Sequence, residues 1–468
     1  MDFYNQDLLV KGLDEGEKLG ADYVEFRYQD KYLANFMYRD GELISTTGSR
    51  EGICTRVLVD GSWGLAATSQ TDQESIFKSV KNAVKMAQGS ASHKDSKISL
   101  AEVDIIEDEA ISPRKIHLKD ISVEEKIQKL IDSTKVVKDY EFVKSFMINY
   151  NEVIDKRMVV TNEGTRVQWE DMKPTVIAYC VAIEEGKMAS GYTSWSHTCG
   201  AEFFDLHPLS QIMDESADKA TRLVKASLPP SGVASLLLDH QLVGVLAHEA
   251  VGHTAEADLV QAGSFTKGKL GQKVCDERIS LVDSPTLKGS NWEGSGWLPF
   301  DDEGVKGKKT YIIKDGIMNS YMTNRAFAAE LEVEATGNAR AYTFRDEPIV
   351  RMRNTYIEAG DMSLDELYEA IGEGFFLCSL QNGQADSSSE FMFGAVECYA
   401  IKNGELTEEL YQNPVLTGNA FEVLSNVIGI GNNFDTNLGA GFCGKEQPAK
   451  VDAGGPFLAV KAMLAGGN

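Results

Sequence analysis

The sequence lacks the features that would place the protein in a membrane, in an oxidising compartment or on nucleic acid. Its 468 residues contain no run of 18 apolar residues and begin without the basic and apolar segments of a signal peptide. The seven cysteines form no Cys-x-x-Cys pair, which is typical of a reducing compartment. The formal net charge of −25 argues against nucleic-acid binding, because that binding needs a basic surface. We therefore expect a cytoplasmic protein with no nucleic acid and no membrane as partner.

Sequence patterns of nucleotide enzymes and serine hydrolases are also missing. Residues 439–444 have the spacing of a dinucleotide fingerprint, but they lie too close to the C-terminus for the helix, strand and acidic residue that must follow. Residues 263–269 begin like a phosphate loop, yet Leu270 stands where a magnesium-binding Ser or Thr is required. No Gly-x-Ser-x-Gly elbow occurs. We predict neither a nucleotide site nor a serine nucleophile.

The most informative motif present is His248-Glu249-Ala250-Val251-Gly252-His253, which places two imidazoles and a carboxylate within six residues. Neutral imidazoles suit Zn²⁺, and a neighbouring carboxylate can take a proton from a metal-activated water. On a regular helix, histidines at i and i+5 point ~140° apart, whereas the common i, i+4 spacing leaves them ~40° apart. A π-bulge, tolerated most readily at Gly252, would bring His253 back over His248. Two partly buried histidines without a metal are the alternative.

The surroundings of this motif favour the metal site. Residues 233–238 predict a buried strand, and Asp239 is a suitable N-cap for a helix beginning near His240. Three of the seven histidines fall within fourteen positions here. Downstream, Glu256 and Asp258 are candidates to accept hydrogen bonds from the ligand imidazoles, with solvated helix carboxylates as the alternative.

The motif and the blocks after it resemble the TldD/PmbA family of metallopeptidases, once described as modulators of DNA gyrase, and in particular its catalytic TldD branch. The resemblance covers nearly the whole chain, including residues 38–64 in the first domain. The similar blocks, in the family's order, are Asp301-Asp302-Glu303-Gly304, residues 335–340, residues 351–357, Gly383-Gln384-Ala385-Asp386 and Gly441-Phe442-Cys443-Gly444-Lys445.

The resemblance implies a ligand set. One Zn²⁺ per chain would be held by His248, His253 and Cys443, with Glu249 as the general base. Three protein ligands leave one position for water, as catalytic zinc sites require. Considered alone, Cys443 would more often be a small buried apolar residue, although the glycines around it favour a tight, exposed loop.

The predicted activity is zinc-dependent hydrolysis of peptide bonds in small or unfolded polypeptides, held in extended form by strand-like pairing. The resemblance also implies a homodimer, or a heterodimer with a PmbA-like subunit. Two alternatives stay open: a non-catalytic binding or adapter subunit, and a metal-dependent amidohydrolase acting on a non-peptide conjugate. Tyr342, His197 and Arg340 are candidates for stabilising the oxyanion, each with a structural role as its alternative.

The expected fold is α+β and multi-domain. The composition, 43% hydrophobic and 25% charged, is that of a globular chain of two or three domains. Pro229-Pro230 marks the boundary between an N-terminal α+β region at 1–228, with a subdivision near 93–121, and a β-rich C-terminal metal-binding peptidase domain at 229–468. Turn residues at 39–41 and 60–62 recur at offsets of 123 to 125, a candidate internal duplication. Periodicity predicts helices at 5–20, 71–89, 123–139 and 207–226, and strands within 22–68, interrupted at 40–41, 48 and 60–61, and within 144–195.

Overall fold

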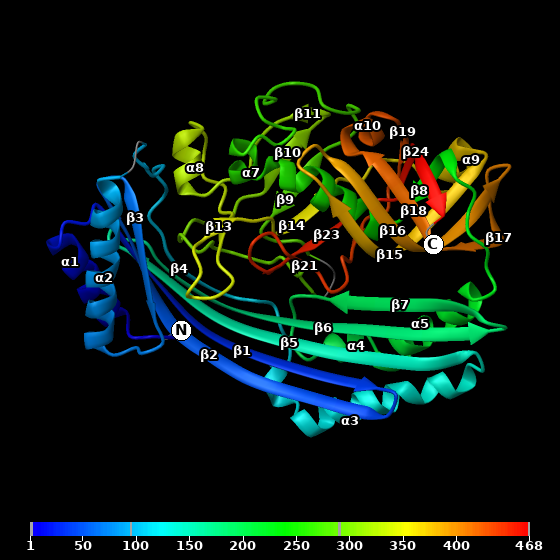
Figure 1. Ribbon diagram of the computed structural model, residues 1–468, viewed down its shortest axis with the longest axis horizontal. Helices are drawn as coiled ribbons and strands as arrows, with labels where there is room; N and C mark the ends of the chain where they lie inside the picture. The colour runs from blue at the N-terminus through cyan, green and yellow to red at the C-terminus, as the bar shows by residue number, and fades with distance from the viewer. Residues whose placement is uncertain (1–2, 94–95, 289–291, 467–468) are drawn as a thin grey trace.

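The structure, a computed structural model, describes residues 3–93, 96–288 and 292–466. A long, curved N-terminal sheet lies beneath a C-terminal half built of smaller sheets and short helices (Figure 1). Strands of both halves pair mainly antiparallel, and helices are grouped beside the sheets instead of alternating with them, so the predicted α+β class is confirmed. No helix among the described residues is both long and apolar enough to cross a bilayer.

The N-terminal sheet has the strand order β3-β2-β1-β5-β6-β4, and β7 pairs with β6 beyond the end of β4. All of its pairs are antiparallel except β4 with β6. Its strands are β1 (Tyr23–Arg39), β2 (Glu42–Val59), β3 (Ser62–Thr68), β4 (Glu107–Ile111), β5 (Val143–Thr161), β6 (Arg166–Glu184) and β7 (Lys187–Ser196).

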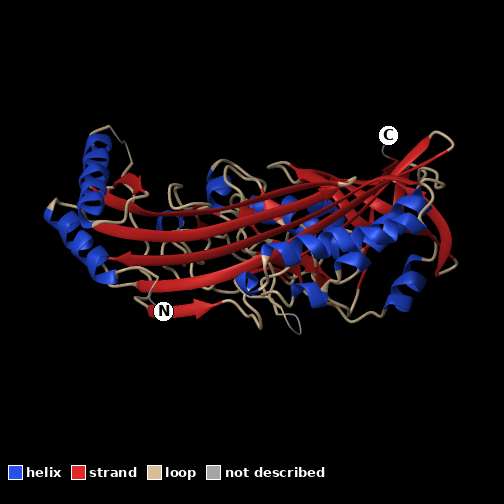
Figure 2. Ribbon diagram, turned by 90° about the horizontal axis from the view of Figure 1, so that it is seen from below, coloured by secondary structure: helices blue, strands red, loops and turns tan. Residues whose placement is uncertain are grey.

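The two faces of this sheet differ in character because successive side chains of a strand point to opposite sides. One face carries apolar residues such as Phe26 and Phe36 of β1, which pack against residues of the helices. Figure 2 shows helices lying against the long sheet. The opposite face carries charged residues such as Lys31, Asp155 and Lys173, and the C-terminal half covers it. The helices of this region are α1 (Gln6–Lys18), α2 (Gln73–Ala91), α3 (Val123–Ser133), α4 (Phe203–Leu206) and α5 (Leu209–Leu223).

The candidate duplication is visible in the element order. A helix, three antiparallel strands and a second helix occur as α1-β1-β2-β3-α2 and again around β5-β6-β7, between α3 and α5. In each repeat a glycine of the third strand lets the following helix approach. A Cβ on Gly64 would overlap the carbonyl oxygen of Ala83, and one on Gly191 would overlap that of Ser216.

Three details of the predicted pattern are wrong. Gly48 does not interrupt a strand, because it pairs with Leu33 in the middle of the long β1–β2 hairpin. The polar segment at 93–121 contains the strand β4. Its charged side chains give no strand pattern in the sequence, and its backbone pairs with β6. The helix predicted at 123–139 ends at Ser133 and continues as a 3-10 helix, Thr134–Asp139.

The C-terminal half contains a seven-stranded sheet in the order β15-β8-β24-β18-β16-β17, with β19 paired to β24. Because β15 also pairs with β16, five of these strands close into a ring. The strands are β8 (Gly232–Leu238), β15 (Gly374–Ala385), β16 (Glu390–Lys402), β17 (Glu405–Gln412), β18 (Pro414–Asn419), β19 (Val427–Ile430) and β24 (Leu458–Gly466).

A second sheet of this half has the order β11-β10-β9-β14-β23-β20, and the helix that carries the histidine motif is buried between the two sheets. Its strands are β9 (Leu281–Ser284), β10 (Thr310–Lys314), β11 (Ile317–Met318), β14 (Asn354–Ile357), β20 (Asp435–Thr436) and β23 (Asp452–Gly455). Two short hairpins are β12 (Ala339–Arg340) with β13 (Ile349–Val350), and β21 (Phe442–Cys443) with β22 (Ala449–Lys450). The helices are α6 (His240–Val245), α7 (Ala257–Gln261), α8 (Arg325–Glu330), α9 (Leu364–Ile371) and α10 (Ala420–Ser425).

Candidate metal centre

The motif helix is fixed at its start by a buried strand and a cap. β8 lies between β15 and β24, and its last three residues are fully buried leucines. The Asp239 side chain then accepts a hydrogen bond from the backbone N–H of Leu242, so it is the N-cap of α6 as predicted. Gly244 has no room for a side chain against the backbone of Ala453 in β23. The helix is thereby held in place before the first histidine.

A π-helix follows α6 directly, from Leu246 to Gly252. The backbone N–H of His253 donates to the carbonyl of His248, five residues earlier, so the predicted widening of the helix is confirmed. Gly252 has ordinary helical dihedrals, and its role differs from the predicted one. A Cβ at this position would overlap the Met352 sulfur, so the glycine provides space for Met352 and is not needed for backbone freedom.

The widened helix brings both histidines, Glu249 and the distant Cys443 to one point. One ligand atom from each of the four residues lies within 4.8 Å of the others. The Cys443 Sγ is 3.1 Å from His253 Nε2, and the two imidazole rings stand nearly perpendicular with centroids 5.1 Å apart. Glu249 lies slightly farther out, with carboxylate oxygens 3.6 Å from His253 Nε2 and 4.0 Å from His248 Nε2.

This arrangement fits a zinc ion. His248 is fully buried, and neither of its ring nitrogens makes a hydrogen bond to any described residue. A buried polar group without a partner is costly, and a metal bond would satisfy it. Ligands at 2.0–2.3 Å from one tetrahedral zinc stand roughly 3.3–3.8 Å apart, close to the 3.1 Å between Cys443 Sγ and His253 Nε2. Two imidazoles and a thiolate are also a donor set that zinc prefers.

The cysteine is buried, contrary to the exposed loop that its glycine neighbours suggest. Cys443 lies in β21 and is paired with Ala449 of β22, while Gly439 and Gly441 just before it have positive φ and form the expected tight turn. Burial raises the pKa of the thiol, but His248 and His253 outweigh this effect and lower the pKa to about 3. The sulfur is therefore a thiolate, the form that binds metals.

Two residues outside the four-residue cluster fix the orientation of His253. Its Nδ1 is 2.6 Å from a carboxylate oxygen of the fully buried Glu256, which leaves Nε2 to face the cluster. Lys445, two residues after the cysteine, lies 3.1 Å from the same Glu256 oxygen. Burial raises the pKa of Glu256, yet His253 and Lys445 bring it down to about 2. The expected role of Glu256 as an acceptor for the imidazole is confirmed.

Asp258 contacts no ligand histidine among the described residues, so its expected role is wrong. It accepts hydrogen bonds of 2.7 and 2.9 Å from Lys445. Sequence reasoning missed Lys445, although the signal was present in its position within the Gly-Phe-Cys-Gly-Lys block. A cation next to a buried carboxylate is the expected compensation for that charge.

A cleft of about 240 Å³ opens in front of Glu249. It lies between the edge strand β7 and the far part of β15, with the turn before Cys443 forming a third side. The oxyanion candidates Tyr342, His197 and Arg340 do not line it. His197 is instead fully buried and stacked on Trp292. The cleft is lined by Tyr192, Ser194, Gln241, Val245, Glu249, Leu380, Gln381, Gly383, Leu438, Ala440, Gly441 and Phe442.

Comparison with known proteins identifies the family. Sequence models of the PmbA/TldA metallopeptidase domain 1, central domain and C-terminal domain match residues 24–87, 116–228 and 231–467. A metalloprotease of Methanocaldococcus jannaschii is 36% identical over 95% of this chain and 97% of its own length. A zinc metalloprotease TldD homolog of Saccharolobus solfataricus is 29% identical over 98% of this chain and all of its own.

Solved structures show the same fold. The crystal structure of a putative modulator of a DNA gyrase from Thermotoga maritima superposes with a TM-score of 0.79 at 21% identity, covering 98% of this chain and 100% of the other. TldE from Thermococcus kodakarensis gives 0.78 at 18% identity, covering 97% and 99%. The three matched domains span most of the chain, and the most similar of these relatives is a metalloprotease. The chain belongs to the PmbA/TldD family of metallopeptidases.

Proposed function

We propose that the protein is a zinc peptidase whose metal is held by His248, His253 and Cys443, with Glu249 as its general base. The observation that carries the proposal is the convergence of these four residues, from two segments 190 residues apart, beside an open cleft that Glu249 lines. A structural zinc site would use four protein ligands, whereas three ligands beside a carboxylate facing a cleft suit catalysis.

In the proposed reaction the residues have separate tasks. Bound zinc would supply a Lewis acid that lowers the pKa of water and polarises the scissile carbonyl. Glu249 accepts the proton of the attacking water and passes it to the nitrogen of the departing amine. Glu256 keeps the proton of His253 on Nδ1, so that Nε2 is free to bind the metal. A thiolate ligand reduces the charge of the ion more than an imidazole does, so we expect a modest rate.

The cleft suggests how a substrate is held. Tyr192 and Ser194 belong to β7, which pairs only with β6 among the described strands. Leu380, Gln381 and Gly383 belong to β15, which pairs on this side with β8 only up to Leu377. Two strand edges thus flank the general base, and side chains already occupy some of their backbone groups: Leu380 N–H donates to Gln241, and the Ser194 carbonyl accepts from Asn437. We propose that an extended peptide lies between them and pairs through its main chain, independently of its sequence.

This mode of binding selects for small or unfolded polypeptides, because a folded protein has no free extended segment to insert. Assembly is part of the proposal on the strength of the family resemblance: a homodimer, or a heterodimer with a PmbA-like subunit, would enclose the cleft further. Light scattering measures the mass of the assembly. Rapid cleavage of a compact, loop-poor protein by a verified monomer would contradict both halves of this proposal.

A digest of a peptide library tests the activity. We expect cleavage by the zinc-loaded protein, loss of cleavage on chelation, and recovery when zinc is returned. The products should carry new carboxyl and amino termini at internal peptide bonds. Zinc-dependent release of a non-peptide conjugate with intact peptides would favour the amidohydrolase alternative, and peptide binding without cleavage would favour an adapter subunit.

A further inference from the structure

A second cavity lies behind the β21–β22 hairpin, between the charged face of the long sheet and the C-terminal half. In this antiparallel pair Phe442 is opposite Lys450, and Cys443 is opposite Ala449. The Cys443 sulfur belongs to the metal cluster, whereas Phe442, Ala449 and Lys450 of the same hairpin line the cavity. One two-stranded hairpin thus separates the two sites.

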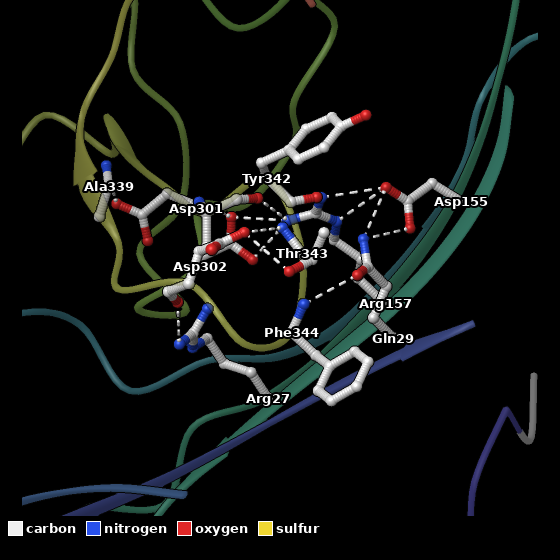
Figure 3. Close-up of polar contacts among 12 residues, drawn as sticks. Arg27, Gln29, Asp155, Arg157, Asp301, Asp302, Ala339, Tyr342, Thr343 and Phe344 are labelled. Carbon is white, nitrogen blue, oxygen red and sulfur yellow. Dashed lines mark hydrogen bonds and ion pairs between the residues drawn. The ribbon is translucent and has the colours of Figure 1, made fainter. Parts of the chain in front are cut away.

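Most of the charges that line this cavity are positive. Arg157 is bound by two carboxylates, those of Asp155 and Asp302, and part of this wall is drawn in Figure 3. The six cations are Lys31, Arg157, Lys173, Arg340, Arg351 and Lys450, and the two acids are Asp155 and Asp171.

Three of the cations have no ion pair with any described residue. The Arg340 guanidinium donates to the carbonyls of Met352 and Lys450. Arg351 donates to the carbonyls of the hairpin, including that of Cys443 at 2.8 Å. Lys450 donates to the Thr175 hydroxyl and the Ala440 carbonyl. Neutral oxygens hold these side chains in place, and the carboxylates that act on them, such as Asp452 on Lys450, form no ion pair with them, so their charge is only partly compensated.

Groups around the cavity also lack hydrogen-bond partners. Arg351 is 1% exposed, and its Nε makes no hydrogen bond to a described residue. Asp171 is ion-paired with Lys173, and its Oδ1 has no partner either. Burial lowers the pKa of Lys450 to about 7 and raises that of Asp171, so the cavity favours both the neutral lysine and the protonated acid. An anion in the cavity would raise the pKa of Lys450 again.

The cavity measures about 80 Å³. Since about 10–15 Å³ of such space is enough for one water, the cavity has room for several waters or for one small oxyanion. We infer that it is a binding site for a small oxyanion, a carboxylate or an inorganic ion of similar size, held by Lys450, Arg351 and Arg340.

Two sources of such a ligand exist, a free anion and the terminal carboxylate of a peptide. Phe442, whose ring lies 4.7 Å below the Lys450 ammonium, lines both this cavity and the cleft in front of Glu249. A peptide in the cleft that extends past Phe442 would bring its C-terminal carboxylate to the cations. This second source rests on the proposed function, whereas binding of a free anion does not.

The test uses the zinc-loaded full chain and compares Lys450→Met, which keeps the shape and removes the charge, with Lys450→Arg, which keeps the charge. Acetate and phosphate are titrated while the melting temperature is recorded. We expect both anions to raise the melting temperature of the wild type and of Lys450→Arg, and at least half of that shift to be lost in Lys450→Met. Anion bound at the zinc shifts the melting temperature of all three proteins equally, so it does not contribute to the difference between them.

A matched control is Lys126→Met, which removes another buried lysine, one that is paired with Glu152 and lies in α3 on the other, helix-covered face of the long sheet. Its melting temperature should fall, but its response to anions should equal that of the wild type. Equal anion shifts in Lys450→Met and the wild type, or no shift in either, would overturn the inference.

The source is separated with one peptide made as the free acid and as the C-terminal amide, each bound to Glu249→Gln so that no cleavage occurs. Tenfold or more tighter binding of the acid, lost in the double variant with Lys450→Met, assigns the site to the substrate terminus. Equal binding of acid and amide, with the anion shifts still dependent on Lys450, assigns it to a free anion. Neither readout requires hydrolysis, so failure of the proposed activity would be seen separately.

Discussion

Glu249 of the π-helix and Glu256, which caps the next helix α7, have opposite surroundings. The Glu249 side chain is 29% exposed and faces the cleft, whereas Glu256 is fully buried and tied to His253 and Lys445. A carboxylate that exchanges protons with a substrate must be reachable, and one that orients a ligand must be fixed. The structure therefore separates the proposed proton-transfer group from the orienting group.

The first prediction is that Glu249→Gln abolishes peptide hydrolysis and leaves zinc bound. The amide cannot accept a proton, but it removes no assigned ligand. Removal of a general base typically costs about 10²–10⁴-fold in rate. Zinc content by elemental analysis, measured beside kcat, checks this, and loss of the metal in this variant would show that Glu249 is a ligand.

The second prediction concerns Glu256→Gln, which should weaken zinc binding about 10–100-fold while the protein stays folded. Gln removes the charge that fixes the His253 tautomer and leaves Lys445 without one of its two carboxylates. Asp258→Asn is the matched control, because it removes the other carboxylate of Lys445 without touching the histidine. Competition with a chromogenic chelator measures both affinities, and equal losses would mean that Glu256 acts only through Lys445.

The third prediction follows from the Cys443 thiolate. Its pKa of about 3 in the zinc-free protein means that the thiolate persists at every pH above that value. Alkylation by iodoacetamide after chelation should therefore be nearly independent of pH between 5 and 8, whereas an ordinary thiol reacts about tenfold more slowly for each unit below its pKa. Zinc-loaded protein should resist labelling. Mass spectrometry of the Cys443 peptide distinguishes these cases, and Cys443→Ser should sharply lower zinc occupancy.

The π-helix is the element on which the histidine geometry depends. On a regular helix, histidines five residues apart would point away from a common metal ion, and the π-helix brings them together. Met352 packs into the space left by the missing side chain of Gly252. A sequence with the i, i+4 spacing would need neither feature. The extra residue in the motif therefore requires the π-helix, and the glycine beside the second histidine makes room for Met352 next to it.

The fourth prediction tests this coupling. Gly252→Ala should destabilise the protein by about 1–3 kcal/mol through overpacking against Met352, and lower zinc affinity as the π-turn shifts. Met352→Ala in the same chain removes the obstacle and should restore a large part of the zinc affinity, although its own cavity costs stability. Urea unfolding and metal competition are measured for the wild type, the two single variants and the double variant. Additive effects of the two substitutions would contradict the proposed packing.

Local elements were predictable from the sequence where one physical signal dominated. Amphipathic periodicity located α1, α2 and α5, and the Asp239 cap marked the start of α6. The spacing of the histidines predicted the π-helix, because no other helix geometry would join them. β4 escaped detection, because its charged side chains carry no strand pattern and only its backbone pairs with β6.

At the scale of the whole molecule, one tetrapeptide joins the C-terminal half to the long sheet. Asp301 accepts hydrogen bonds from the backbone of Glu303, Val305 and Ala339, which shapes the loop. Asp302 accepts two hydrogen bonds of 2.7 Å from Arg157 of β5 (Figure 3). Glu303 is ion-paired with Arg56 of β2. The Asp-Asp-Glu-Gly block, which composition alone does not explain, holds the two halves together.

Long-range features of this kind were beyond sequence reasoning. Cys443 entered the proposed ligand set only through a family resemblance, because it lies 190 residues from His253 and no motif in the sequence links the two. Three of the six cavity cations come from β1, β6 and the β21–β22 hairpin, and nothing in the order of the chain brings Lys31, Lys173 and Lys450 together. Only the pairing of β1, β5 and β6 aligns the first two on one face of the sheet.

The last prediction measures the junction between the halves. Arg157→Met removes one partner of a buried network and leaves Asp155 and Asp302 without their shared cation, so it should cost about 3–5 kcal/mol of unfolding free energy. Lys402→Met, which breaks the exposed pair with Glu409, should cost at most about 1 kcal/mol. Because Arg157 also donates to the carbonyls of Ala341 and Tyr342, its loss should expose the loop at 341–347 to proteases before the rest of the chain. Urea denaturation gives the two costs and limited proteolysis gives the first site cut; similar costs for both variants, or first cleavage elsewhere, would mean that the halves are held together mainly by apolar packing.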